Sequence, residues 1–249
     1  VTGNIGPTLL QTLADALDAQ LLDANASLPQ VWVLELSSFQ LEHTRSLRAD
    51  AAAMLNLTED HMDRYDGMAD YAAAKSRIFH GDGAQVLNRA DRWSMGMARA
   101  GRNTSTFGTS PPSGDAEWGI RRTRQDGELA RGDLSLLAVN ELPVAGLHNA
   151  ANALAAMALV HAIGRFEASA LGALRSFRGL PHRVQRVAEV GGVTFYDDSK
   201  GTNVGAVVAA LHGLTQPVVL IAGGEGKGQD FSPLAPAVAD RARAVVLIG

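Results

Sequence analysis

The chain has 249 residues, a formal net charge of −4 at pH 7 and no cysteine. Its composition, 46% hydrophobic and 19% charged, is typical of a soluble globular protein with one large domain or two ordinary ones. The acidic balance disfavours a nucleic-acid partner, and the lack of cysteine excludes disulfides, Cys-ligated zinc and thiolate catalysis. Because no apolar run approaches the roughly 20 residues that span a bilayer, and no signal peptide is present, we expect a cytoplasmic protein without membrane contact.

Both ends of the chain resemble cuts through a longer protein. Val1 leads at once into Gly3-Asn4-Ile5-Gly6 without an initial Met, and residues 245–249 have the pattern of a strand that ends in a turn. We therefore expect further sequence on either side.

The first part of the chain alternates between strand and helix patterns. Apolar runs predict a buried strand over residues 31–36 and further strands over 51–57 and 85–88. Helical spacing predicts helices over residues 8–18, 70–79, 92–99, 147–163, which Gly164 closes, and 168–177. Residues 101–142 differ, because a turn cluster at 111–115 lies among short strand-like pieces over 117–122, 128–131 and 134–139. These pieces predict an antiparallel patch on an α/β domain.

Gly179-Leu180-Pro181 is the expected boundary between a domain over residues 1–179 and a second over 180–249. Beyond it, strands over 193–196, 218–222 and 244–248 alternate with helices over 204–214 and 233–239. This alternation predicts a parallel, doubly wound sheet, so the chain as a whole is α/β.

Two polar clusters follow predicted strands of the first domain. We expect Glu35 and the segment 56–61 at neighbouring strand ends of one parallel sheet, facing one cleft. Glu35 ends an apolar strand, where a carboxylate is costly unless it is paired or bound to a metal such as Mg²⁺. The plainer interpretation of residues 35–42 is a capping box with Ser38 as N-cap, and both can hold together. The segment 56–65 carries acids, His61 and an Arg at a strand's carboxyl end, where open α/β sheets bind ligands. A solvated loop with local ion pairs is the alternative.

Two helices carry candidate residues. Lys75 lies in an Ala-rich helix, where a lysine taken alone is usually a solvent-facing charge. Asn149 and Asn152 open the 147–163 helix and, being three residues apart, share a face. Their amides suit either capping of that helix or recognition of an adenine edge.

The second domain offers three polar turns. Arg183 follows the boundary and suits either phosphate binding or a structural ion pair. Asp198 suits ribose hydroxyls or metal-bound water, Lys200 is a cation beside it, and Thr202 or Asn203 would cap the next helix. The Gly-rich run 223–231 fails the G-x-x-x-x-G-K-[ST] spacing of a P-loop, so it predicts a loop that offers backbone N–H groups and Lys227 to an anion.

Together and in this order, the motifs resemble those of the Mur ligases. The resemblance covers essentially the whole chain and rests on residues 3–6, 34–42, 56–65, 74–75, 148–152, 179–183, 198–203 and 223–231. The form of the second, seventh and eighth motifs resembles the members of the family that add D-glutamate. One departure is Gly201, where the family pattern has Ala.

The resemblance implies a fold with three parts: a UDP-binding domain, an ATP-binding central domain and a Rossmann-like C-terminal domain. This chain would hold most of the central domain and about the first half of the C-terminal one. The P-loop of the family is expected just upstream of Val1, so the chain alone is expected to be inactive.

The resemblance also implies an activity, the ATP-dependent ligation of D-glutamate to UDP-N-acetylmuramoyl-L-alanine in peptidoglycan precursor synthesis. The reaction would pass through an acyl phosphate, with Mg²⁺ at two sites, in a monomer. A related enzyme, folylpolyglutamate synthetase, shares the carbamylated lysine and the acyl-phosphate chemistry and is an alternative. The forms of residues 37–40 and 198–203 argue against it. A non-catalytic nucleotide-binding module is a further alternative.

The residues carried over from the family fall into four groups. Glu35, His61 and Lys75, the last as a carbamate, would hold Mg²⁺ and act in catalysis. Asn4 would contact the muramoyl substrate, and Ser37 is a further substrate-binding position. D-glutamate would meet Lys200, Thr202 and Lys227, and ATP would be held by Asn149, Asn152, Arg183 and Asp198.

Overall fold

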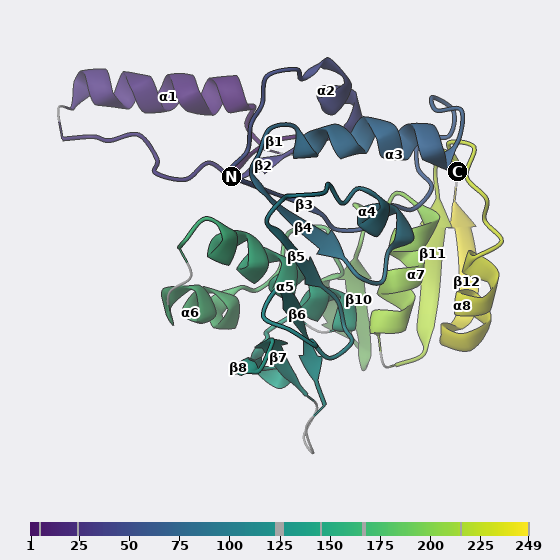
Figure 1. Cartoon of the computed structure of the whole chain (residues 1–249). Helices are drawn as coiled ribbons and strands as arrows, with labels where there is room; N and C mark the ends of the chain where they lie inside the picture. Colours follow the sequence, from purple (N-terminus) through teal and green to yellow (C-terminus); the bar gives the residue numbers. More distant parts are fainter. Residues whose placement is uncertain are drawn as a thin grey trace.

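Six strands form the central sheet of this computed structural model, which describes residues 1–4, 6–23, 25–122, 127–144, 146–165, 168–214 and 216–248 (Figure 1). In spatial order they are β3 (Ala51–Met54), β4 (Ala84–Asn88), β5 (Thr104–Phe107), β6 (Glu117–Arg121), β7 (Glu128–Arg131) and β8 (Leu134–Ala138). The pairs from β3 to β6 are parallel, and those from β6 to β8 are antiparallel. The prediction of a parallel sheet with an antiparallel patch is confirmed.

Strand β5 was not predicted from the sequence. Its residues, Thr-Ser-Thr-Phe, include one apolar side chain, and that side chain, Phe107, is 1% exposed. The β-branched threonines suit a strand, but a run this short and polar gives no clear hydrophobic period.

Neighbouring residues of β4 belong to different cores because successive strand side chains point to opposite faces. Val86 joins the core on one face of the sheet, and Leu87 joins the core on the other. The first core also contains Phe107, Trp118 and Leu129. The sheet therefore needs a cover on each face, which the helices supply.

Helix α5 (Leu147–Ala162) covers the first face. Its alanines at 150, 153, 155 and 158 pack with Leu154 and Met157 against the strands. Because the alanine side chains are small, the helix axis can approach the sheet closely. The helix ends before Gly164, whose φ of 69° is the left-handed conformation that a helix C-terminus favours.

Helix α3 (Met68–Ser76), the short helix η1 (Arg77–Phe79) and α4 (Arg92–Gly96) cover the opposite face. Tyr71, Ala72, Ala74 and Phe79 supply the buried side chains of this layer. Helix α2 (Ser38–His43) packs against α3. The carboxylate of Asp91 caps α4 by accepting from Ser94 N at 2.6 Å, and it also accepts from Leu57 N at 2.9 Å. Asp91 thus fixes the start of the 56–65 segment.

The first motif lies outside the central sheet. Strands β1 (Thr2–Gly3) and β2 (Leu34–Glu35) pair only with each other among the described residues, and α1 (Leu9–Leu22) projects from them (Figure 1). The strand predicted over residues 31–36 exists only at Leu34–Glu35, and the prediction that it is buried is wrong, because Val31 and Val33 are 45% and 52% exposed. An apolar run predicts burial only where another element covers it, and β2 has only the two-residue β1 as a partner.

The last third of the chain begins with helix α6 (Ala168–Ser176), which follows the short helix η2 (Val139–Glu141) and α5. Strands β11 (Val218–Gly223) and β12 (Ala242–Ile248) are parallel, as the alternation predicts, with α7 (Val204–Gly213) packed against α8 (Leu234–Arg241). The predicted strand over 193–196 is β10 (Val193–Asp197), which instead pairs antiparallel with β9 (Gln185–Val190). Gly191 and Gly192 form the turn, both at positive φ, which suits a tight hairpin.

In the part of the chain that the structure describes, no helix has the length and apolarity needed to cross a membrane.

The antiparallel patch offers a direct test of the core. Leu129 in β7 is fully buried, whereas Leu134 in β8 is 52% exposed. We expect Leu129→Ala to lower the free energy of unfolding of the intact protein by about 2–5 kcal/mol, because it leaves a cavity. The matched Leu134→Ala should change it by about 0.5 kcal/mol or less. Equal losses in denaturant titrations of the two variants would contradict the assignment of Leu129 to the core.

Candidate active site

The tip of the β1–β2 pair holds the first two candidate residues. Asn4 N donates to Glu35 O at 2.7 Å, and both residues are exposed. The pairing requires Gly3, because a Cβ at this position would lie 2.2 Å from Glu35 O and its φ is 130°. Asn4 and Glu35 therefore lie side by side.

Helix α2 begins directly after this tip. Its N-cap is Ser37, not the predicted Ser38: Ser37 Oγ accepts from Gln40 N at 3.3 Å, and Gln40 Oε1 accepts from Ser37 N at 2.9 Å. Ser38 is the first helical residue and is 2% exposed, so its side chain faces the protein interior. The capping box itself was predicted, one residue out of register.

The 56–65 segment turns back on itself at His61. His61 has a φ of 57°, a conformation that few non-glycine residues adopt, and its carbonyl accepts from Arg64 N at 2.9 Å. The Asp60 carboxylate accepts from His61 N at 3.0 Å. The His61 ring lies 4.8 Å from the Phe39 ring, centroid to centroid, so α2 and this turn meet.

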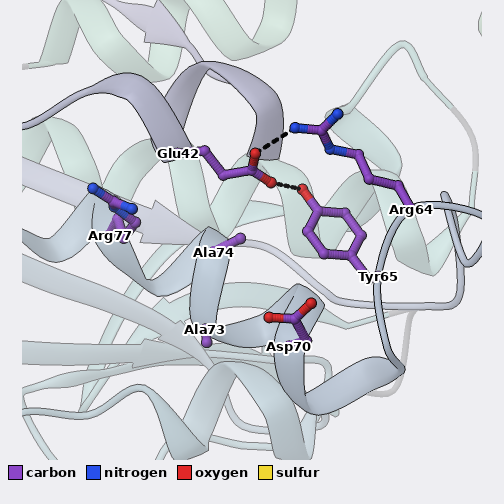
Figure 2. Close-up of a pocket in the computed structure, with 7 residues that line it drawn as sticks. All are labelled: Glu42, Arg64, Tyr65, Asp70, Ala73, Ala74 and Arg77. Atoms are coloured by element: carbon purple, nitrogen blue, oxygen red, sulfur yellow. Dashed lines mark hydrogen bonds and ion pairs between the residues drawn. The ribbon is translucent and has the colours of Figure 1, made fainter.

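The end of the same segment is held by Glu42 of α2. Its carboxylate accepts from Arg64 Nη2 and from Tyr65 Oη, each at 2.5 Å (Figure 2). The hydrogen bond from Arg64 is the main cause of the lowered pKa of Glu42. These residues line a hollow of about 570 Å³ with Asp70, Ala73, Ala74 and Arg77 of α3 and η1. These hydrogen bonds hold the end of the 56–65 segment against α2.

Lys75 is half-buried rather than solvent-facing. Burial lowers the pKa of its ammonium, whereas the negative charges of Asp60 and Glu35 oppose this shift. Its Nζ lies 5.6 Å from the centroid of the Tyr71 ring. Burial is also the main reason that the pKa of Tyr71 rises to about 12, so this phenol keeps its proton at neutral pH. Lys75 thus shares one electrostatic environment with Glu35 and Asp60.

The predicted geometry of this cluster is therefore correct in one respect and wrong in another. Glu35 and the 56–61 segment were expected at neighbouring strand ends of one parallel sheet, but β2 and β3 belong to different sheets. They are brought together instead through α2 and α3, because Phe39 contacts His61 and Lys75 lies in the field of both acids.

The Gly-rich loop after β11 reaches the same place. Lys227 Nζ forms an ion pair with Asp60 Oδ1 at 3.4 Å, with the two side chains 26% and 13% exposed. Asp230 N donates to Glu59 Oε2 at 3.4 Å, and Gln229 Oε1 accepts from Val204 N at 2.9 Å. The loop thus joins the start of α7 to the 56–65 segment. Lys227 itself has a φ of 50°.

The other polar turns of the C-terminal part lock onto each other. Asp198 Oδ1 accepts from Val184 N at 3.0 Å, and Arg183 Nη1 donates to Lys200 O at 3.2 Å. Burial raises the pKa of Asp198, while the hydrogen bond from Val184 and the charge of Arg183 lower it. Thr202 is exposed and precedes α7. The N-cap of α7 is Asn203, one of the two residues predicted as its cap.

The start of α5 meets these turns through His148. Its ring fits between Gly146 and Gly213, at each of which a Cβ would lie 2.7 Å from the His148 ring. Burial lowers the pKa of His148, and the charge of Asp198 opposes this. The N-cap of α5 is Gly146, which has no side chain with which to cap the helix. Asn149 is half-buried and Asn152 is exposed.

Two groups of candidate residues thus form. His61, Lys75 and Lys227 lie near Asp60, and the charge of Glu35 acts on Lys75. Arg183, Asp198 and Lys200 gather near the start of α5. Asp60 is the residue that sequence reasoning counted among the acids but gave no role. Its position directly before His61 was the available signal. Within the described ranges, no three His, Cys, Asp or Glu side chains gather closely enough to hold a metal ion.

Comparison with known proteins identifies the fold. The MurF ligase from Acinetobacter baumannii superposes with a TM-score of 0.63 at 18% identity, over 98% of this chain and 66% of that one. The UDP-N-acetylmuramate-alanine ligase MurC from Thermotoga maritima gives 0.60 at 18%, over 99% and 60%. At such identities the likeness shows that the fold is that of these ligases.

The family follows from the sequence matches. The profile of the Mur ligase middle domain matches residues 2–160, and that of the Mur ligase glutamate ligase domain matches residues 182–249. The chain belongs to the Mur ligase family.

Among its curated relatives, the UDP-N-acetylmuramoylalanine–D-glutamate ligase of Nitrosospira multiformis is 56% identical over 100% of this chain and 52% of its own length. The protein of that name from Dechloromonas aromatica is 54% identical over 99% and 53%. The chain spans about half the length of the curated relatives it matches.

The Lys227–Asp60 pair can be tested apart from any activity. We expect Asp60→Asn in the intact protein to speed hydrogen exchange of the amides of residues 226–230 several-fold, because the loop loses a partly buried ion pair of roughly 1 kcal/mol. Asp63→Asn, an exposed carboxylate of the same segment, is the matched control and should leave the exchange unchanged. Unaltered exchange in Asp60→Asn would mean that the pair does not hold the loop.

Proposed function

We propose that the intact protein ligates D-glutamate to UDP-N-acetylmuramoyl-L-alanine with ATP, in the cytoplasmic synthesis of peptidoglycan precursors. The observation that carries this proposal is the approach of Lys75 and Lys227 to Asp60, with the charge of Glu35 also acting on Lys75. Relatives at 54–56% identity are named UDP-N-acetylmuramoylalanine–D-glutamate ligase. The reaction joins an amine to a carboxylate, so the carboxylate is first activated as an acyl phosphate. Positioning and neutralisation of charge then supply most of the catalysis.

Mg²⁺ fits the donor chemistry of Glu35, His61 and Lys75 only if Lys75 is modified. Glu35 and His61 offer two ligands, and an ammonium would repel a cation. A carbamate on Lys75 would replace that positive charge with an anionic oxygen ligand, and a metal held there would offset the charge of the phosphates. We therefore propose Glu35, His61 and carbamylated Lys75 as ligands in one or two Mg²⁺ sites, in a protein that acts as a monomer.

The burial of Lys75 favours its carbamylation. The neutral amine is the form that attacks CO₂, forming a C–N bond and releasing a proton, and burial lowers the pKa of Lys75. Asp60 and Glu35 oppose the shift, and an anionic carbamate beside them needs cations, which Mg²⁺ would supply. The protonated Tyr71 phenol is a hydrogen-bond donor next to Lys75.

The remaining candidate residues are proposed as substrate contacts. Asn4 and Ser37 lie at the β2–α2 junction, suited to the muramoyl substrate. Lys200, Thr202 and Lys227 would hold D-glutamate, whose two carboxylates need cations. Asn149, Asn152, Arg183 and Asp198 are proposed for ATP, supported by the approach of Asp198 to the start of α5. The division into domains at residues 179 and 180 remains part of this proposal.

An assay of the acceptor tests the proposal directly. With ATP, Mg²⁺ and D-glutamate, the intact protein should consume UDP-N-acetylmuramoyl-L-alanine and release one phosphate for each bond formed. Turnover of a folate acceptor in its place would favour the folylpolyglutamate synthetase alternative, and ATP binding without glutamate-dependent turnover would favour a non-catalytic nucleotide-binding module.

Lys227→Ala tests the binding of the amino acid. We expect it to raise the KM for D-glutamate far more than that for ATP, because one charge-assisted hydrogen bond is worth roughly 1.5–3 kcal/mol, about 10- to 150-fold. Glu225→Ala, an exposed residue of the same loop, is the control and should leave both values near those of the wild type. Weakened ATP binding with unchanged glutamate kinetics would assign Lys227 to the nucleotide instead.

Lys75→Ala tests the carbamate. The variant should keep its fold and lose nearly all ligation, and acetate or formate should restore part of the rate by occupying the vacated anionic position. Lys75→Arg should not respond, because the guanidinium fills the space with the wrong charge. The measurement is the rate against acetate concentration at constant ionic strength. Full activity of Lys75→Ala would refute the role, and a dead variant without rescue would argue against the carbamate.

A further inference from the structure

A small basic hollow lies at the C-terminal end of α3 and shares Arg77 with the larger hollow described above. It has a volume of about 240 Å³ and is lined by Thr44, Arg45, Arg77, His80 and Arg99. Three of these five side chains carry a permanent positive charge, and no carboxylate is among them. The lining comes from the ends of α2, η1 and α4, which are far apart in the sequence.

The backbone around the hollow is held in place from within the protein. The fully buried side chain of Gln85 in β4 accepts from Arg99 N at 2.8 Å and donates to Met97 O at 3.2 Å. Thr44 is the C-cap of α2 and donates from Oγ1 to Gln40 O at 2.6 Å. His80 N donates to Arg77 O at 3.0 Å. The backbone at Arg77 and Arg99 is therefore held in place, while the side chains of all three arginines are exposed.

Two acidic groups nearby are engaged elsewhere, and a third, Asp70, lines the larger hollow with Arg77 but forms no ion pair with it. Asp82 forms an ion pair with Arg48, and Glu42 is shared between Arg64 and Tyr65. In the described part of the chain, no ion pair joins Arg45, Arg77 or Arg99 to a carboxylate.

The carbonyl oxygens at the end of η1 are also taken, because Arg102 donates to Phe79 O at 3.4 Å and to Gly81 O. Arg99 Nη2 donates to Ser76 O at 3.3 Å, which leaves its other donors available. The lining of the hollow thus concentrates positive charge and includes no carboxylate.

This hollow is distinct from the candidate active site. Successive residues of a helix are rotated by about 100° around its axis. Arg77 therefore lies on the side that carries Asp70 and Ala73, and Lys75 lies on the side that carries Tyr71. Figure 2 shows Arg77 at the edge of the larger pocket, with no dashed line from it to the other residues drawn. An anion bound there would not touch Lys75.

We propose that the hollow is a binding site for a phosphate group, either free inorganic phosphate or the phosphate of a small ester. Guanidinium groups match the oxygens of phosphate with paired N–H donors, and their charge is permanent. The hollow is smaller than the roughly 300–1,000 Å³ of sites that enclose a whole ligand, so it takes the phosphate and leaves any attached group in solvent. The proposal does not depend on the proposed ligation.

The test compares phosphate binding by the intact protein with that of an Arg45→Ala/Arg77→Ala variant, by calorimetry at constant ionic strength set with chloride. The double variant should lose one binding event or bind phosphate there at least tenfold more weakly, about 1.4 kcal/mol. Arg48→Ala is the matched control, a nearby exposed arginine already paired with Asp82, and should bind as the wild type does. Phosphate at the candidate active site is common to all three proteins and cancels in the comparison.

Two further arms sharpen the result. Arg45→Ala alone changes an exposed side chain outside the helices, so it keeps the test valid if the double variant does not fold, and it should weaken binding at least threefold. AMP is titrated in the same way as phosphate, and only the binding that the substitutions abolish is compared. Equal affinity for AMP and phosphate assigns the site to phosphate esters, and weaker AMP binding assigns it to free phosphate. Unchanged phosphate binding in both variants, or equal displacement by chloride at matched ionic strength, would overturn the proposal.

Discussion

The burial of Lys75 is the constraint on which the candidate site depends. Burial of an ammonium is costly unless nearby groups offset the loss of water, and here Asp60 and Glu35 do so only in part, because the pKa of Lys75 remains lowered. Each is where it is for a local reason: Gly3 lets β1 approach Glu35, and the turn at His61 sets Asp60. The same burial that makes the charge costly favours the neutral amine that carbamate formation requires. The cost of burying Lys75 and the proposed chemistry thus have one origin.

Asp60 also links the two parts of the chain. Its carboxylate meets Lys227 from the Gly-rich loop, while the neighbouring Glu59 accepts from the backbone of Asp230. A lysine ammonium has three N–H donors, so the contact with Asp60 leaves donors of Lys227 for a second carboxylate. In the proposed reaction, Asp60 would therefore hold Lys227 in place while the lysine binds D-glutamate.

Much of the fold was predictable because its helices and buried strands carry strong local patterns. The run of alanines in α5 and the alternation of Val86 and Leu87 in β4 are of this kind. The failures have physical causes as well. Strand β5 is too polar to show a period, and the apolar run at 31–36 has no cover in the described residues. The hairpin of β9 and β10 was missed although Gly191-Gly192 marks its turn.

The candidate site was predictable in its members but not in its geometry. Motif order pointed to Glu35, His61 and Lys75 as candidates. No pattern in the sequence could show that Glu35 lies in a separate small sheet, or that Asp60 lies near both Lys75 and Lys227. Such facts depend on how α2 and α3 pack. The roles assigned to the individual residues stay predictions of the account.

The measurement that tests the central claim most directly is carbon-13 NMR of the intact protein equilibrated with ¹³C-labelled bicarbonate. The account predicts a lysine carbamate resonance in the wild type that is absent from Lys75→Ala. It also predicts that Mn²⁺ broadens this resonance, and does so less in Glu35→Ala, because the carbamate and Glu35 would share a metal. A wild-type spectrum without that resonance, or a resonance that Mn²⁺ leaves sharp, would contradict the account.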